Sequence, residues 1–206
     1  MSYKINADDI NLSLEEKSWF YQENFVSNDL CLSLTSTYLS RDKKDSLIEA
    51  KIGIGSKLSG NAFIRNGSVK WIDDWNESSS LNVLNSMFSE IMISIKDYFR
   101  LSIKRFESQF SFYNQGGFYK CHLDQHKTSR HRQISCCLYL NDCIEGGELV
   151  IYARGSKTKI DKIIKPLRGS LVLFFSADIY HEVKVVHDSR YSITTWFRDD
   201  KALPFI

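Results

Sequence analysis

The second half of the chain constrains the fold most, because it is built from short segments of strand length. From Arg105 onward, runs of aromatic and β-branched residues alternate with turn signals such as Gly116-Gly117 and Gly146-Gly147. The runs cover residues 106–113, 118–122, 134–140, 149–152, 171–175, 181–186 and 191–197. Roughly eight short strands at this spacing predict a sandwich or barrel of the jelly-roll type.

The first half is predicted to support these strands with helices. The strongest helical pattern spans about residues 80–100, where apolar residues recur at spacings of three and four: Leu81, Leu84, Phe88, Ile91, Ile95 and Tyr98. A second helix is expected to run from the N-cap Ser27 to about Leu39. Short strands are expected at residues 19–21 with 25–26, at 47–54 and at 69–72, and the polar residues 1–16 predict a partly ordered lead-in.

These patterns together predict a mainly β (α+β) fold, in which supporting N-terminal helices cover a jelly-roll core. With 206 residues, of which 43% are hydrophobic, the chain is long enough to bury one core of its own. We therefore expect residues 1–206 to form a single domain, with the supporting helices and short strands in 1–104 and the jelly-roll core in 105–200.

Three residues of the strand-rich half have the chemistry of a metal site. His122 and Asp124 are separated by Leu123, and His181 follows on a later segment. On an extended strand, residues i and i+2 point to the same side, so His122 and Asp124 can reach one ion while Leu123 faces the core. Two imidazoles and one carboxylate can bind one face of Fe(II) and leave the other open for oxygen and a co-substrate. Zinc is the alternative metal for these ligands.

The other histidines compete for this assignment. His126, His131 and His187 lie in polar segments, and we interpret them as surface residues. His126 can in principle replace Asp124 as the partner of His122. A single histidine or aspartate is most often a surface or hydrogen-bonded residue, so only the combination in its strand context indicates a metal site.

Arg190 is the candidate for binding a carboxylate. It begins the segment 190–197, just after the turn that follows His181. A guanidinium there can clamp a carboxylate through two parallel hydrogen bonds, and Tyr139 can add a phenol donor. Taken alone, an arginine at the start of a strand is commonly exposed, and a strand tyrosine is commonly a core aromatic.

Composition narrows the partners and the compartment. The net charge of +2, from 27 basic and 25 acidic residues, gives no reason to expect a nucleic-acid or membrane partner. The N-terminus lacks the apolar run of a signal peptide, and no apolar stretch is long enough to span a bilayer. The 5 cysteines have no C-x-x-C spacing, which favours free thiols in a cytoplasmic protein.

Several stretches carry a resemblance to a known family. They are residues 113–124, 138–141 with 146–149, 166–175, and 181–183 with 190–196, and the earlier segment 65–72 adds a looser match. These stretches resemble the Fe(II)- and 2-oxoglutarate-dependent dioxygenase superfamily. Within it they are most similar to the prolyl 4-hydroxylase branch, which includes the hypoxia-sensing prolyl hydroxylases and their bacterial relatives.

The resemblance implies a double-stranded β-helix with iron held by His122, Asp124 and His181. It also implies that Arg190 pairs with the distal carboxylate of 2-oxoglutarate. Four further residues would assist: Tyr139 and Thr194 beside that carboxylate, Tyr113 (matched only with one gap) along the pocket, and Trp196 at the substrate.

The implied reaction is oxidative. The enzyme would consume 2-oxoglutarate and O2, release succinate and CO2, respond to ascorbate as a stimulant, and hydroxylate a prolyl residue in a cytosolic protein. A free amino acid or other metabolite is the alternative substrate, and a helix or loop closing a small pocket would favour it. An open groove beside Trp196 and residues 41–60 would favour a polypeptide. A non-catalytic metal-binding module on the same scaffold is the third interpretation.

Demethylation of nucleic acids fits the resemblance less well. Relatives with that activity usually carry a second arginine six positions after the first, and position 196 is a tryptophan.

Overall fold

The computed structural model describes residue 3 and residues 5–39, 48–49, 64–125 and 129–201. The helices in these ranges are α1 (Ala7–Lys17), α2 (Asn28–Leu39) and α4 (Ser79–Phe99). The strands are β1 (Trp19–Gln22), β2 (Ile48–Glu49), β3 (Arg65–Asn66), β4 (Ser68–Trp71), β5 (Arg105–Tyr113), β6 (Phe118–His122), β7 (Arg132–Tyr139), β8 (Leu149–Tyr152), β9 (Ile160–Ile164), β10 (Leu171–Phe175), β11 (His181–Val183) and β12 (Arg190–Arg198).

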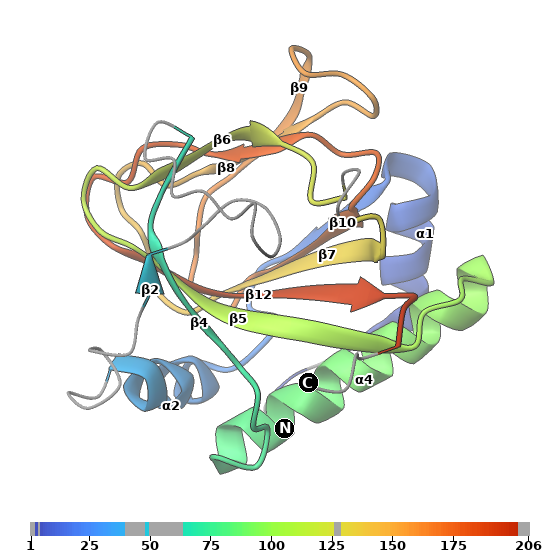
Figure 1. Cartoon of the computed structure of the whole chain (residues 1–206), viewed down its shortest axis with the longest axis horizontal. Helices are drawn as coiled ribbons and strands as arrows, with labels where there is room; N and C mark the ends of the chain where they lie inside the picture. The colour runs from blue at the N-terminus through green and yellow to red at the C-terminus, as the bar shows by residue number, and fades with distance from the viewer. Residues whose placement is uncertain (1–2, 4, 40–47, 50–63, 126–128, 202–206) are drawn as a thin grey trace.

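The strands form two antiparallel sheets. The seven-stranded sheet has the order β1-β10-β7-β12-β5-β4-β2, and the five-stranded sheet has the order β3-β6-β11-β8-β9. Figure 1 shows the smaller sheet over one face of the larger sheet, with α4 along the other face. The predicted jelly roll with supporting N-terminal helices is therefore confirmed.

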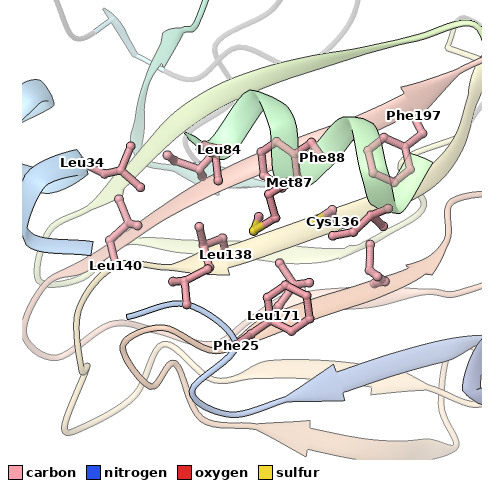
Figure 2. Packing of buried hydrophobic residues seen from close by; sticks show 14 of the residues in the cluster. Phe25, Leu34, Leu84, Met87, Phe88, Cys136, Leu138, Leu140, Leu171 and Phe197 are labelled. Atoms are coloured by element: carbon pink, nitrogen blue, oxygen red, sulfur yellow. The ribbon is translucent and has the colours of Figure 1, made fainter. Parts of the chain in front are cut away.

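The strands of the larger sheet have two buried faces. In β7, Cys136 and Leu138 belong to the cluster shared with the helices, whereas Cys137 and Tyr139 belong to the cluster between the sheets. This alternation follows from the two-residue period of a strand. Figure 2 shows residues of α4 packed over residues of β7, β10 and β12. One face of the larger sheet thus makes the main core, and the other is available for a site.

The predicted long helix is confirmed as α4. Ser78 caps it by accepting a hydrogen bond from the backbone N–H of Leu81 at 3.2 Å. Five of the six predicted stripe residues are fully buried: Leu81, Leu84, Phe88, Ile91 and Ile95. Tyr98 is the exception, since it is 44% exposed and its hydroxyl donates to Glu15 at 2.7 Å. Its predicted place in the stripe is wrong because that hydrogen bond keeps the ring at the surface.

The prediction of a partly ordered lead-in is wrong for residues 7–17, which form α1. Ile10 and Leu14, one turn apart, are each 1% exposed and pack into the main core. Asn11 donates from Nδ2 to Ser94 of α4 at 2.9 Å. Only two apolar anchors mark this helix in the sequence, so its stability comes from packing against α4 rather than from a local pattern.

The short strands agree only in part. The segments 19–21 and 69–72 are confirmed as β1 and β4, but at 25–26 only an isolated bridge pairs Val26 with Tyr3. Of residues 47–54, only β2 lies within the described residues. Strand β9 was not predicted, because it is the outermost strand of its sheet and only Ile164 is buried, which leaves no alternating pattern.

The second helix begins after Ser27, as predicted, and Leu30, Leu34 and Tyr38 are buried. All five cysteines are free thiols. Within the described ranges, no helix has the length and apolar character needed to cross a membrane.

Candidate active site

The smaller sheet brings the two predicted metal-binding histidines together. His122 ends β6, His181 begins β11, and these residues are direct partners in the sheet. Their ring centroids are 4.2 Å apart. Asp124 completes the group, and one ligand atom from each of the three residues lies within 4.8 Å of the others. The structure therefore assembles the predicted trio.

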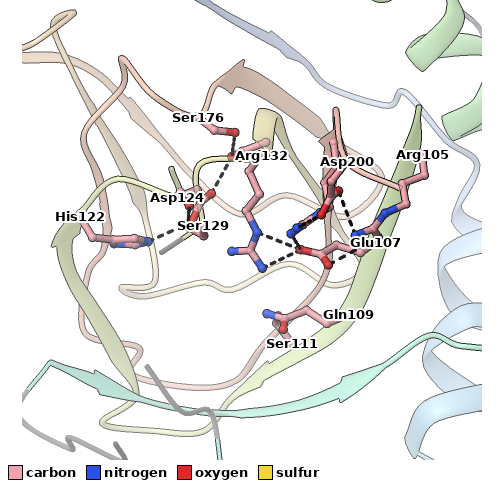
Figure 3. A network of polar contacts seen from close by, with 12 residues as sticks. Arg105, Glu107, Gln109, Ser111, His122, Asp124, Ser129, Arg132, Ser176 and Asp200 are labelled. Atoms are coloured by element: carbon pink, nitrogen blue, oxygen red, sulfur yellow. Dashed lines mark hydrogen bonds and ion pairs between the residues drawn. The ribbon is translucent and has the colours of Figure 1, made fainter. Parts of the chain in front are cut away.

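The route by which Asp124 reaches this position differs from the sequence argument. Strand β6 ends at His122, Asp124 lies in the bend that follows, and Leu123 is only half-buried rather than in the core. The Asp124 carboxylate is held by Ser135 of β7, whose hydroxyl donates to Oδ2 at 2.7 Å. The hydroxyl of Ser135 also contacts the hydroxyl of Ser176, and Figure 3 shows Asp124 between His122 and Ser176. Contacts between the two sheets, not strand alternation, place the carboxylate.

The protonation of the two imidazoles follows from their backbone contacts. Nδ1 of His122 lies 2.8 Å from the carbonyl oxygen of Lys120, and Nδ1 of His181 lies 3.1 Å from that of Ile179. A carbonyl only accepts, so each Nδ1 carries the proton of this contact and Nε2 is the ring nitrogen available to a metal. The Nε2 atoms face Asp124 at 3.4 Å and 3.6 Å. This is the tautomer that a metal ligand needs.

The charges also suit a divalent metal. Burial and the neighbouring His122 outweigh the attraction of Asp124 and lower the pKa of His181 to about 4. Burial acts to raise the pKa of Asp124, but the two histidines outweigh it and keep the pKa well below its usual range. At neutral pH the group thus offers an ionised Asp124 carboxylate and a neutral His181 imidazole. These donor types fit Fe(II).

Arg190 forms the second part of the site. It begins β12, is 2% exposed, and lies over the rings of Tyr139 at 4.8 Å and Tyr113 at 5.4 Å. Its guanidinium donates to the hydroxyl of Ser192 at 3.3 Å and lies 4.0 Å from the sulfur of Cys137. Among the described residues, the buried Nε of Arg190 and the buried hydroxyl of Tyr139 have no hydrogen-bond partner at bonding distance. A buried cation without an anion is costly, so the geometry fits a carboxylate ligand at this point.

The other two predicted residues continue along the same face of β12. Thr194 lies 3.4 Å from the hydroxyl of Ser111 through its Oγ1. Trp196 is paired with Ser135, the residue that donates to Asp124. Every second side chain of β12 points toward the smaller sheet, at positions 190, 192, 194 and 196. Strand β12 therefore carries both the carboxylate-binding end and the aromatic end of the site.

The competing histidines do not join the group. His131 is paired with Asp199 at 2.7 Å and His187 with Glu145 at 3.7 Å, both at the surface. His126 lies outside the described residues. The predicted choice of His122, Asp124 and His181 over these histidines stays consistent with the structure.

Three neighbours of the site were not predicted. The ring of Tyr119 stacks on that of His122 at a centroid distance of 3.6 Å. Arg132 lies 3.6 Å above the ring of Trp196, and Ser135 holds Asp124. Ser135 had a usable signal, since it is polar on the same face of its strand as Cys137 and Tyr139. Arg132 and Tyr119 had none, because their roles depend on contacts between strands far apart in sequence.

A model of the 2OG-Fe(II) oxygenase superfamily, named for 2-oxoglutarate (2OG), matches residues 108–198, the span from β5 to β12. This part of the chain, which carries the candidate site, is similar to that superfamily. Members of the superfamily are 2-oxoglutarate-dependent dioxygenases, which use Fe(II), 2-oxoglutarate and O2. No curated protein sequence matches the chain significantly.

Solved structures similar to this chain include several prolyl hydroxylases. The prolyl-4-hydroxylase of Pseudomonas putida shares 26% identity at a TM-score of 0.82, over 95% of this chain and 100% of that chain. A Trichoplax adhaerens prolyl hydroxylase, bound to a peptide of a hypoxia-inducible factor, shares 21% sequence identity at a TM-score of 0.82, over 94% of this chain and 89% of that chain. The viral collagen prolyl hydroxylase of Paramecium bursaria Chlorella virus-1 shares 18% sequence identity at a TM-score of 0.64, over 90% of this chain and 98% of that chain. The last two show the shared fold alone.

Proposed function

We propose that this oxygenase hydroxylates a prolyl residue of a protein, with release of succinate and CO2. In this proposal His122, Asp124 and His181 hold Fe(II), and Arg190 with Tyr139 holds the distal carboxylate of 2-oxoglutarate. Tyr113 and Thr194 line the same pocket. The observation that carries the proposal is the meeting of a His-Asp-His group with a buried guanidinium and phenol that have no anion to bind.

The chain contributes position and shielding to the reaction. Bound iron and 2-oxoglutarate supply the oxidising chemistry in enzymes of this kind. The two Nε2 atoms and the Asp124 carboxylate present three donors to one side of a metal and leave the other side open. Arg190 orients the co-substrate from its far end. Arg190 is 2% exposed, with Cys143 and Val186 near its side chain at Gly147, and this burial strengthens its electrostatic contact with an anion.

An aromatic and cationic surface beside the triad supports a polypeptide substrate. We call Trp71, Arg132 and Trp196 the rim surface. Trp71 is 39% exposed, and its ring lies 6.1 Å from that of Trp196. Arg132 covers Trp196 and is fixed by Glu107 through two contacts of 2.9 Å and 2.8 Å (Figure 3). Preformed aromatic surfaces of this type bind extended, proline-containing peptides.

The similar structures support the same substrate class. The Pseudomonas putida structure covers nearly the whole chain and is a prolyl-4-hydroxylase, and the Trichoplax structure contains a peptide. We further propose a cytosolic protein target, because five free thiols are typical of a reducing compartment.

The test measures succinate formed from 2-oxoglutarate with Fe(II), O2 and ascorbate. The protein fraction and the small-molecule fraction of a source-cell lysate are added in turn, and His181→Ala protein is the control. We expect stimulation by the protein fraction, together with one added oxygen atom on a prolyl residue found by mass spectrometry. Stimulation by small molecules alone would instead indicate a metabolite hydroxylase. Absence of succinate in every condition would leave the non-catalytic metal-binding module.

The rim surface gives a second test. Trp71→Ala removes an exposed ring, so we expect a higher KM for the stimulating protein with the affinity for 2-oxoglutarate unchanged. Tyr98→Ala, which removes another partly exposed ring on α4, is the matched control. Equal KM values for the two variants would contradict the assignment of this surface to the substrate.

A further inference from the structure

A second arginine, Arg65, lies beside the candidate site on the smaller sheet. It lies in β3, which pairs with β6 so that Arg65 is opposite Tyr119. Its guanidinium carbon lies 4.7 Å from the ring centroid of Tyr119 and 6.0 Å from that of Tyr113. Its buried Nε atom has no hydrogen-bond partner in the part of the chain that the structure describes. No carboxylate of the described residues forms an ion pair with Arg65.

Arg65 and Arg190 both lie close to the ring of Tyr113. Tyr113 lies within 6.0 Å of the Arg65 guanidinium and 5.4 Å of the Arg190 guanidinium. The turn after β3 packs directly on this ring, because a Cβ at Gly67 would come within 2.8 Å of Tyr113 Cδ1 and Cε1. Both cations therefore lie within 6.0 Å of the ring of one buried residue, Tyr113.

Arg65 lies near the candidate metal ligands. Tyr119, on which it stacks, itself stacks on the metal-ligand candidate His122 at 3.6 Å with an angle of 20° between the rings. Although burial lowers the pKa of Arg65, the facing Tyr113 and Tyr119 and the charge of Asp124 raise it above its usual value. The arginine thus stays charged, and only one aromatic ring separates it from the triad.

We propose that Arg65 is the second cation of the co-substrate pocket and binds the keto-acid carboxylate, the end of 2-oxoglutarate next to the metal. This inference rests on the proposed function. The co-substrate is a dianion with one carboxylate at each end, and Arg190 accounts for one of them. A partly buried guanidinium with no anion is unfavourable, so a matching negative charge at the metal end stabilises both partners.

This assignment has a consequence for metal binding. A fixed positive charge beside the triad repels a divalent cation that arrives alone and attracts the anionic chelator that accompanies it. Arg65 therefore makes tight metal binding depend on the co-substrate. A purely structural role, in which Arg65 only supports Tyr119 and through it His122, would have the opposite effect and weaken metal binding when Arg65 is removed.

The experiment compares full-length protein with Arg65→Gln, Arg65→Lys and Arg190→Gln by calorimetric titration. Mn(II) is titrated alone, and the Mn(II)-loaded proteins are titrated with 2-oxoglutarate and with pyruvate, which carries the keto-acid end without the distal carboxylate. We expect Arg65→Gln to weaken both organic ligands tenfold or more while Mn(II) alone binds as well as before or better. Arg190→Gln is expected to weaken 2-oxoglutarate and to leave pyruvate unchanged.

Arg65→Lys keeps the charge but lacks the planar guanidinium, so we expect its loss of affinity for both organic ligands to be intermediate. This variant also provides the test if Arg65→Gln fails to fold. Arg154→Gln, at a side chain that is 70% exposed, is the control for loss of a surface charge. Unchanged affinities for both ligands in the Arg65 variants would overturn the inference. A parallel loss of Mn(II) affinity would also overturn it, in favour of a structural role. If the unaltered protein with Mn(II) did not bind 2-oxoglutarate, the proposed function itself would fail.

Discussion

At the scale of single residues, the site depends on buried hydroxyl groups behind the metal-ligand candidates. Ser135 Oγ lies 2.7 Å from Asp124 Oδ2 and 2.7 Å from the hydroxyl of Ser176. Ser135 therefore donates to the carboxylate and accepts from Ser176. Outer contacts of this kind orient a ligand and raise its affinity for a metal.

Ser135→Ala should weaken Mn(II) binding about 10- to 100-fold, because it frees the Asp124 carboxylate to rotate. Ser108→Ala is the matched control, since Ser108 is also buried and hydrogen-bonded, to Thr195 at 2.8 Å, without touching the triad. Both variants should lower the free energy of unfolding by about 1 kcal/mol or more. Equal Mn(II) affinities, measured by calorimetry, would show that Ser135 has no role in metal binding.

Arg190 permits a separate test of geometry and charge. Arg190→Gln removes both, and we expect a loss of about 3 kcal/mol in 2-oxoglutarate binding, roughly 150-fold. Arg190→Lys keeps the charge without the paired hydrogen bonds, so its loss should be smaller, about tenfold. Calorimetry on Mn(II)-loaded protein measures both values. If the lysine variant bound as tightly as arginine, two parallel hydrogen bonds would not be part of the site.

At the scale of elements, β12 spans the length of the site and α4 supports it. Arg190 and Trp196 lie six residues apart on one face of β12, a separation of about 20 Å at the usual rise of a strand. The co-substrate end and the rim surface are therefore at opposite ends of one rigid element. The other face of β12 contributes Ile193 and Phe197 to the core that α4 covers.

Leu84→Ala on α4 should lower the free energy of unfolding by about 2–5 kcal/mol, because Leu84 is fully buried and the change leaves a cavity. Ile93→Ala on the same helix should change it by less than about 0.5 kcal/mol, since Ile93 is 54% exposed. Denaturant unfolding followed by circular dichroism measures both. Similar losses for the two variants would contradict the packing of α4 on the larger sheet.

At the scale of the whole molecule, the proposed ligands connect the two sheets. His122 and His181 come from the smaller sheet, and Arg190 and Tyr139 come from the larger sheet. A metal with its co-substrate would therefore contact both layers at once and stabilise only the folded state.

Mn(II) with 2-oxoglutarate at one hundred times its dissociation constant should stabilise the fold by about 2.7 kcal/mol. For a chain of this size we expect a rise in Tm of roughly 5–10 °C. Thermal unfolding of the native protein and of His181→Ala, with and without the ligands, measures it. The variant should show no rise. An unchanged Tm in the native protein would favour a scaffold without metal or co-substrate.

Local patterns in the sequence predicted most strands from residue 105 onward and α4, and side-chain chemistry singled out the metal-ligand candidates and Arg190. The period of two in the strands, the period of nearly four in α4, and the ligand chemistry of His122, Asp124, His181 and Arg190 are all visible without a structure. These features depend on neighbours within one turn or one strand, or on side-chain chemistry alone.

Only the tertiary structure decided α1, β9 and the surroundings of the triad. Ile10 and Leu14 form a helix because α4 covers them, and Asp124 is placed by Ser135 from another sheet rather than by alternation along β6. Arg65 reaches Tyr119 because β3 pairs with β6. The register between strands far apart in sequence determines these contacts, and no local pattern specifies that register.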